Sequence, residues 1–100
     1  MRIKTMLNRE LLEKQARILR AISHPVRIAL LDLLQEKKGL TVTEIHNTLR
    51  LKQAENSHHL GILRDKGILK TECEGKSIMY SLRTKKLSQI IDCINSCNFH

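Results

Sequence analysis

Aromatic residues are scarce in this chain of 100 residues, which has one tyrosine, one phenylalanine and no tryptophan. Modules that bind single-stranded nucleic acid obtain much of their binding energy by stacking bases on exposed aromatic rings. Tyr80 and Phe99 are too few to supply such a platform. The composition therefore argues against a single-strand binding module.

Long apolar segments are missing as well. The longest uninterrupted apolar run, Ile28 to Leu31, is far shorter than the roughly 20 residues that a membrane-spanning helix needs. The N-terminal residues alternate charged with hydrophobic side chains, so we expect neither a signal peptide nor a membrane partner. The three cysteines are then expected to be reduced thiols rather than a disulfide framework, which predicts a cytoplasmic protein.

The sequence motifs typical of enzymes are also lacking. There is no glycine-rich phosphate loop, no paired acidic motif and no cysteine–histidine arrangement suited to nucleophilic catalysis. We therefore expect the protein not to be an enzyme.

Basic residues, by contrast, are abundant. Eighteen Lys and Arg against ten Asp and Glu give a formal net charge of +8, which favours a polyanionic partner. Because the aromatic content argues against single strands, duplex DNA is the better candidate. One hundred residues form a single domain with a modest core, so an oligomer is expected.

Apolar residues at helical spacing predict two helices in the first third of the chain, over 6–22 and 25–36. The Ser23-His24-Pro25 segment separates them, because proline is tolerated only in the first turn of a helix. In the second helix the residues expected to face inward are Val26, Ala29, Leu30, Leu33 and Leu34.

A helix-turn-helix is predicted from 42 to 66. Thr41 and Glu44 have the spacing of a capping box at the start of a short helix that ends near Arg50. A second helix follows from Gln53 to Lys66, and Gly67 is placed to end it in the left-handed conformation. The helix-turn-helix motif places its second helix in the major groove, which makes the 53–66 helix the predicted recognition helix.

The periodicity of the recognition helix divides it into two faces. Asn56, Leu60 and Leu63 are expected to point inward. The outward residues are mostly small, namely Ala54, Ser57, His58, Gly61 and Asp65. Small side chains allow a helix backbone to approach base edges, although the same pattern fits an ordinary solvent-exposed face.

A β-hairpin is predicted after Gly67, where the periodicity changes to two. A turn at Gly75-Lys76 pairs Leu69 with Leu82, Thr71 with Tyr80 and Cys73 with Ile78. We expect Cys73 to be a small buried residue on the inward face. Such a hairpin is the wing of a winged helix, with Lys76 as a phosphate contact or, alternatively, a solvated turn residue.

The final helix is predicted from Lys85 to about Asn95, with Leu87, Ile90, Ile91 and Ile94 on one side. Together with the apolar stripe of the 6–22 helix, this surface exceeds what so small a core can cover. A homodimer interface is the expected use.

Three segments resemble the matching segments of the ArsR/SmtB family of dimeric winged-helix repressors: 21–28 (AISHPVRI), 57–69 (SHHLGILRDKGIL) and 75–82 (GKSIMYSL). The resemblance extends over about residues 10–100. It implies a mainly helical winged helix-turn-helix fold with four helices, a hairpin and a fifth helix, and a homodimer formed by the first and fifth helices. It also implies a palindromic DNA operator that is released when an inducer binds, often a metal ion.

Carried over by position, the resemblance assigns DNA contacts to Gln53, Ala54, Ser57, His58, Arg64 and Lys76. The sequence departs from the family pattern nearby. Lys52 and Ala54 stand where a serine or threonine is common, Glu55 brings negative charge, and Asn56 occupies a usually apolar position. These departures keep a second hypothesis open, a dimeric interaction module that no longer reads DNA.

A candidate inducer site lies near the C-terminal end of the sequence, where Cys93, Cys97 and His100 share one helix face if the helix extends that far. Such residues suit zinc or another thiophilic ion. In the family's fifth-helix metal site, however, the two ligand positions at the start of the helix correspond to Thr84 and Lys86, and a lysine ammonium repels cations. The family's Cys-x-Cys pair is also missing from 44–47. We therefore predict that any response runs through the Cys93 and Cys97 thiols, unless these only pack in the dimer interface.

Overall fold

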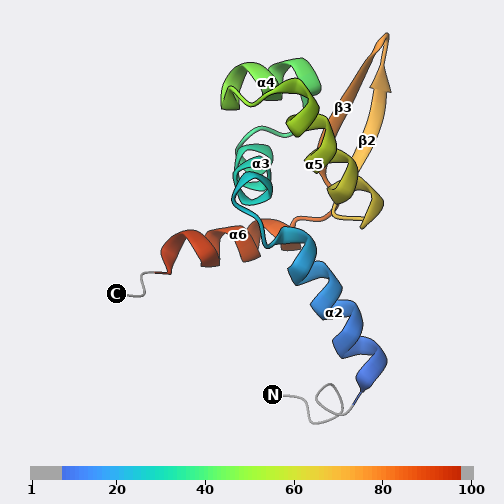
Figure 1. Ribbon diagram of the computed structural model, residues 1–100, viewed down its shortest axis with the longest axis vertical. Helices are drawn as coiled ribbons and strands as arrows, with labels where there is room; N and C mark the ends of the chain where they lie inside the picture. The colour runs from blue at the N-terminus through green and yellow to red at the C-terminus, as the bar shows by residue number, and fades with distance from the viewer. Residues whose placement is uncertain (1–7, 98–100) are drawn as a thin grey trace.

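A computed structural model describes residues 8–97 as a helical body from which a hairpin and two helical arms extend (Figure 1). The elements are α2 (Arg9–Ile22), α3 (Pro25–Glu36), β1 (Leu40–Thr41), α4 (Val42–Leu49), α5 (Gln53–Asp65), β2 (Leu69–Glu74), β3 (Ser77–Leu82) and α6 (Lys86–Ser96). Within the described residues, no helix is both long and apolar enough to cross a membrane.

The predicted break between the first two helices is confirmed. α2 begins after Asn8, whose side chain accepts a hydrogen bond from the Leu11 N–H (3.0 Å); residues 6 and 7 of the predicted helix lie outside the described residues. α3 begins at Pro25, and the His24 Nδ1 accepts from the Val26 N–H (3.1 Å). Each cap satisfies a backbone donor that the helix itself leaves without a partner.

The helix-turn-helix forms as the sequence predicts. The Thr41 hydroxyl accepts from the Glu44 N–H, and the Glu44 carboxylate accepts from the Thr41 N–H, which completes the capping box. α5 ends where Gly67 adopts φ +76°. The Gly67 N–H bonds the Arg64 carbonyl and the Ile68 N–H bonds the Leu63 carbonyl, the pair of bonds of a Schellman motif.

The hairpin has the predicted register, with Leu69 opposite Leu82 and Thr71 opposite Tyr80. A third strand, β1, was not predicted. It pairs with β3 at Leu40–Tyr80 and Thr41–Met79, which gives the strand order β1-β3-β2. Two residues are too few for a periodicity signal, and the capping box at Thr41 marks the same position as a helix start.

The core lies where α3, α4, α5, the base of the hairpin and α6 meet. Its fully buried apolar side chains are Leu30, Leu31, Ile45, Leu60, Leu63, Leu69 and Ile91. The prediction that Ala29 faces inward is wrong, because Ala29 is exposed while Leu31 is fully buried. At about 100° per residue, Leu30, Leu31 and Leu34 share one side of the helix and Ala29 lies on the other.

The prediction for Cys73 is also wrong, because Cys73 is exposed. Near the base of the hairpin, Leu69 and Tyr80 are buried against the body. Beyond them the hairpin projects away from the helices (Figure 1), so inward-facing residues such as Ile78 have nothing to pack against.

Candidate DNA-binding surface

The two faces of α5 differ in exposure as predicted. Asn56, Leu60 and Leu63 are buried, together with His59. The expected contact residues of the same helix lie on its exposed side, namely Gln53, Ala54, Ser57, His58 and Arg64. Gly61 is half-buried, and Asp65 is exposed. Over its first two turns, α5 therefore presents to solvent the short side chains of Ala54 and Ser57 together with Gln53, Glu55 and His58.

The start of α5 lacks a side-chain cap, as the sequence predicts. Lys52 occupies the N-cap position and makes no capping hydrogen bond. Its neighbour Glu55 is exposed in the first turn. A carboxylate there interacts favourably with the helix dipole, although it opposes a nearby phosphate. The first turn therefore has backbone N–H groups that a bound group can use.

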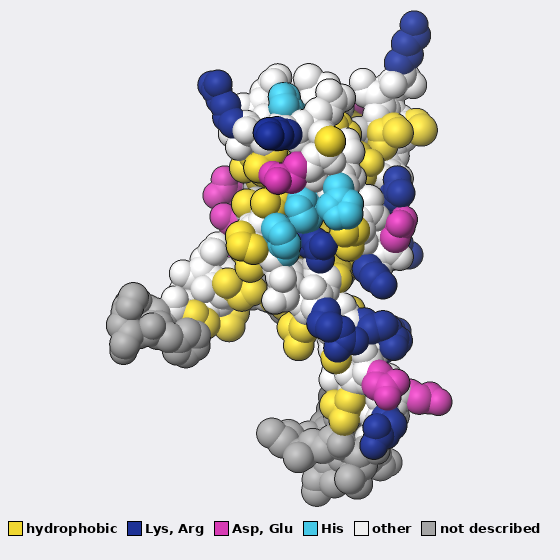
Figure 2. Space-filling model, viewed as in Figure 1, with side chains coloured by type: hydrophobic (Ala, Val, Ile, Leu, Met, Phe, Trp, Pro, Cys, Tyr) yellow, Lys and Arg dark blue, Asp and Glu magenta, His cyan; other side chains and the backbone are white. Residues whose placement is uncertain are grey.

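The wing adds a basic group beside this helix. Gly75 adopts φ +62°, which allows the tight turn, and the next residue, Lys76, is exposed. Figure 2 shows a basic side chain standing at the far end of the hairpin. The wing and α5 lie side by side in Figure 1, and the start of β2 packs against α5. One partner can therefore contact both elements.

Arg64 is the second-last residue of α5 and pairs with its neighbour Asp65. The Nη2 to Oδ1 distance is 3.2 Å, and both side chains are largely exposed. Exposed ion pairs contribute little free energy, so this pair leaves Arg64 free to bind an external phosphate.

Three histidines, His24, His58 and His59, cluster where α5 meets the start of α3, and the sequence did not predict this cluster. His59 is buried with 6% exposure, and its Nδ1 accepts a hydrogen bond from the Nε of Arg27 (3.1 Å). The ring of His24 lies 4.4 Å from the ring of His59, and that of His58 lies 5.2 Å away. Figure 2 shows histidine side chains gathered beside basic groups on this face. The only sequence signals were the His-Pro and His-His pairs.

Arg27 also fixes the junction between α2 and α3, because its Nη1 donates to the Ala21 carbonyl (3.1 Å). Burial lowers the pKa of His59, and the nearby His24, Arg27 and His58 lower it further, against a smaller opposing effect of Glu55. The neutral ring is the form that can accept the Arg27 hydrogen bond. The contact therefore holds the recognition helix to the α2–α3 junction when His59 is uncharged.

Asn56 is fully buried in the position predicted to face inward. Neither its Nδ2 nor its Oδ1 has a hydrogen-bond partner among the described residues. A buried amide without partners costs roughly 1 to 3 kcal/mol relative to one that is satisfied. Helical periodicity therefore predicts that residue 56 is buried. The packing around Asn56 does not explain why the residue is polar.

The predicted inducer residues are only partly described. Cys93 lies on α6 and Cys97 is its C-cap, and both are exposed. The helix ends at Ser96, and His100 lies outside the described residues. Within residues 8–97, no group of three or more His, Cys, Asp or Glu side chains is arranged to hold a metal ion.

Large apolar side chains remain exposed on the two arms. Leu11, Leu12 and Leu19 lie on α2, with Leu19 61% exposed, and Ile94 lies on α6. Of the predicted apolar side of α6, Leu87 and Ile91 pack into the core instead. The two arms extend from the lower part of the molecule in Figure 1, away from the hairpin and α4.

Comparison with known proteins identifies the fold's relatives. A helix-turn-helix domain family matches residues 22–72. The transcriptional repressor PagR of Bacillus anthracis is 37% identical over 84 residues, which are 84% of each protein. The crystal structure of PagR matches with a TM-score of 0.81 and 35% identity, and covers 88% of this chain and 100% of the PagR chain.

A second relative is a Staphylococcus aureus homologue of the cadmium resistance transcriptional regulatory protein CadC, 31% identical over 77% of this chain and 64% of its own length. Both relatives are named as transcriptional regulators. The winged helix-turn-helix geometry and these matches agree. The chain therefore belongs to the ArsR/SmtB family of helix-turn-helix transcriptional regulators.

Proposed function

We propose that the protein is a homodimeric transcriptional repressor that binds a palindromic duplex DNA operator. The observation that carries the proposal is the exposed face of α5, where small side chains and His58 stand beside a wing with Lys76 at its turn. The net charge of +8 supports a polyanionic partner.

In this proposal each exposed residue has one of two roles. Gln53, Ala54, Ser57 and His58 face the base edges in the major groove. Arg64 and Lys76 bind phosphates, which orient the protein without reading sequence. The half-buried Gly61 lets the backbone approach the DNA closely.

Two substitutions separate these roles. His58→Ala should weaken binding to the operator more than binding to a scrambled duplex, because a lost base contact costs about 1 to 3 kcal/mol of discrimination. Lys76→Ala should weaken both duplexes alike and reduce the salt slope by about 1. Fluorescence anisotropy titrations on both duplexes provide the measurement.

Lys37→Ala is a matched control for Lys76→Ala, because Lys37 is an exposed lysine that caps the end of α3 and belongs to neither α5 nor the hairpin. It should leave the operator affinity nearly unchanged. Equal losses on operator and scrambled duplexes for both His58→Ala and Lys76→Ala would refute the role assignment.

The alternative function, a protein-interaction module, rests on Glu55 and Asn56, and the family match does not favour it. Salt dependence separates the two functions. DNA binding should weaken with a log–log slope of about −0.9 per phosphate neutralised, whereas an apolar protein contact should hardly respond.

We further propose that release from DNA depends on the thiols of Cys93 and Cys97, through a thiophilic ion such as zinc or through oxidation. Both thiols are exposed and one helical turn apart, and one relative is named for cadmium resistance. The family's usual four-ligand site is not expected to operate, because Lys86 stands at one of its positions.

The test is a cobalt and zinc titration of the wild type and of a Cys93→Ser, Cys97→Ser double variant, with the release of DNA followed in parallel. We expect thiolate absorption bands and metal-driven or oxidant-driven release only in the wild type. Cys73→Ser, which removes the exposed thiol on the wing, is the matched control and should behave like the wild type. Tight metal binding and release in the double variant would contradict the proposal.

A further inference from the structure

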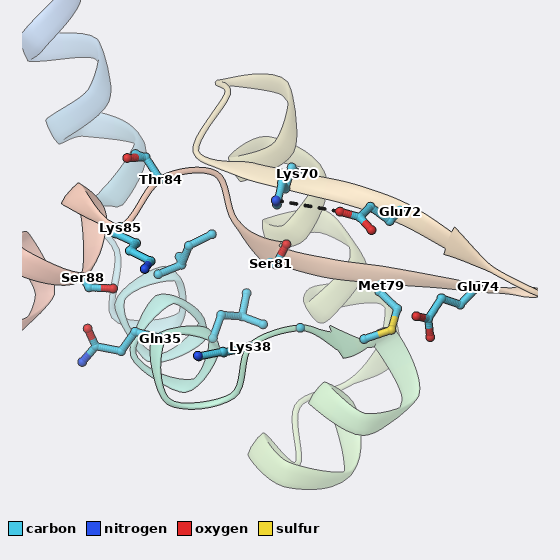
Figure 3. Close-up of a pocket in the computed structure, with 13 residues that line it drawn as sticks. Gln35, Lys38, Lys70, Glu72, Glu74, Met79, Ser81, Thr84, Lys85 and Ser88 are labelled. Carbon is cyan, nitrogen blue, oxygen red and sulfur yellow. Dashed lines mark ion pairs between the residues drawn. The ribbon is translucent and has the colours of Figure 1, made fainter.

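A cavity of about 520 Å³ lies behind the wing, between the end of α3, the sheet and the start of α6 (Figure 3). This volume falls within the usual range of small-molecule sites, roughly 300 to 1,000 Å³. None of the residues proposed to contact DNA lines it. The cavity is therefore separate from the DNA-binding surface.

One end of the cavity is positively charged. Lys38 and Lys85 line it from the loop after α3 and from the residue before α6, and Figure 3 shows their nitrogen atoms at the same end, near Gln35 and Ser88. No salt bridge to either lysine is found among the described residues. The start of α6 also favours negative charge, because the helix dipole is positive there. This end suits an anionic group.

The rest of the cavity has a different character. Leu34, Leu82 and Met79 supply apolar lining. Toward the wing, Glu72 is paired with Lys70 at 3.8 Å, and Glu74 also lines the cavity. Figure 3 shows Glu74 and Met79 at the opposite end from Lys38 and Lys85. An anion is therefore favoured at the lysine end, and an uncharged apolar body fits beyond it.

We propose that this cavity is an effector site for an amphipathic monocarboxylate, with its carboxylate between Lys38 and Lys85 and its hydrocarbon part against Leu34 and Leu82. A free phosphate would leave the apolar lining unused. Lysine ammonium groups act as compact point charges, which is sufficient for a single carboxylate.

The position of the cavity links it to both functional parts of the molecule. Met79, Ser81 and Leu82 belong to β3, the second strand of the wing, and Ser88 lies in the first turn of α6. Gln35 connects the cavity wall to α6, because its Nε2 donates to the Asp92 carboxylate (2.9 Å). A ligand that contacts the base of the wing and α6 together favours the relative position of the two elements in which it binds best, which is the basis for the proposed effect on DNA binding. This regulatory role rests on the proposed function; ligand binding itself does not.

The experiment measures octanoate binding to the full chain by calorimetry in the absence of DNA, with octanamide as the uncharged analogue and inorganic phosphate as the plain anion. We expect octanoate to bind about tenfold or more tightly than either, as the loss of one charged contact commonly produces. Lys38→Gln with Lys85→Gln should remove this preference and leave octanamide binding unchanged.

The neighbouring lysines provide a control of equal charge. Lys37→Gln with Lys86→Gln removes two exposed lysines that do not line the cavity, so octanoate affinity should stay within about twofold of the wild type. The site would be overturned if octanamide or phosphate bound the wild type as tightly as octanoate does. It would also be overturned if the two double variants lost octanoate affinity equally.

DNA titrations with and without octanoate then test regulation. We expect octanoate to lower the operator affinity of the wild type and of the Lys37/Lys86 variant, and to have no effect on the Lys38/Lys85 variant. Octanoate binding without any change in DNA affinity would overturn the effector role. A wild type that binds octanoate but no duplex DNA would refute the proposed function and leave the ligand site standing.

Discussion

Two adjacent histidines of α5 differ in their burial. His58 is exposed on the side proposed to face DNA, whereas His59 is buried and accepts the Arg27 hydrogen bond. Protonation of the His59 Nδ1 removes that acceptor and places a positive charge beside the Arg27 guanidinium. Protonation of His59 therefore weakens the contact between the recognition helix and the α2–α3 junction.

This contact predicts a pH dependence of stability. Because the pKa of His59 is lowered on folding, the folded protein binds fewer protons than the unfolded chain. The stability that the neutral His59 ring contributes is fully present above the pKa of an unfolded histidine, about 6.5. It is lost as the pH falls through 6.5 toward the lower pKa of His59 in the folded protein. The midpoint of urea unfolding should therefore decrease from about pH 7.5 to about pH 5.5.

His59→Gln should reduce this decrease, because glutamine can accept from Arg27 but does not titrate. His58→Gln changes the neighbouring, exposed histidine and should retain the decrease. If the wild type and His59→Gln lose stability in parallel, the pH dependence arises from other groups.

At the residue scale, the sequence predicted which residues are buried better than it predicted which polar side chains contact each other. Helical periodicity alone placed Asn56 among the buried residues of α5. The Arg27–His59 bond joins residues 32 apart in the chain, and no local pattern reports it. Polar contacts of this kind depend on how α3 and α5 pack, which is determined by the whole core.

At the scale of the helix, the question at Gly61 is whether packing or function requires a glycine. A Cβ at Gly61 would meet only the Arg64 Nη2 at 4.0 Å, so the fold does not need glycine here. Glycine inside a helix costs about 0.5 to 1 kcal/mol relative to alanine. In the proposed DNA complex, close approach of the helix backbone to DNA is the reason for it.

Gly61→Ala should therefore raise the free energy of unfolding by about 0.5 to 1 kcal/mol and weaken operator binding. Urea unfolding and anisotropy titrations measure the two effects. Gly67→Ala is the contrasting variant: nothing lies within 4 Å of its Cβ, but φ is +76°, so it should lose stability by about 1 to 2 kcal/mol. Unchanged operator affinity in Gly61→Ala would show that this part of α5 stays away from the DNA.

Helices and strands were predictable from the sequence where capping residues, glycines and hydrophobic periodicity indicated the same structure. The capping box at Thr41, the stop at Gly67 and the alternation on either side of Gly75 all predicted structure that is observed. The errors concern tertiary packing. β1 exists only because it pairs with β3, and Cys73 is exposed only because the hairpin extends beyond the helices.

At the scale of the molecule, the arms and the DNA-binding surface point to one assembly. The exposed leucines lie on α2 and Ile94 lies on α6, and both helices extend away from the wing and α4 (Figure 1). A two-fold interface on the arms would leave both recognition helices free. Half-sites in such an arrangement lie about one helical turn, roughly 34 Å, apart.

Leu12→Glu with Leu19→Glu should convert the proposed dimer to a monomer, because two charges from each chain would be buried in an apolar interface. Both leucines are exposed in the single chain, so the monomer should keep its fold and its circular dichroism. Sedimentation velocity should show half the mass. Operator affinity should fall by at least about tenfold, since each monomer then binds one half-site alone.

Ile78→Glu tests whether any exposed apolar residue gives this result. Ile78 is 47% exposed but lies on the wing, which projects away from both arms (Figure 1), so its substitution should leave the dimer intact. If the Leu12/Leu19 variant sediments as a dimer, the arms do not form the interface. If the wild type binds its operator as a stable monomer, the dimeric repressor itself is refuted, because a palindromic site needs two recognition helices related by symmetry.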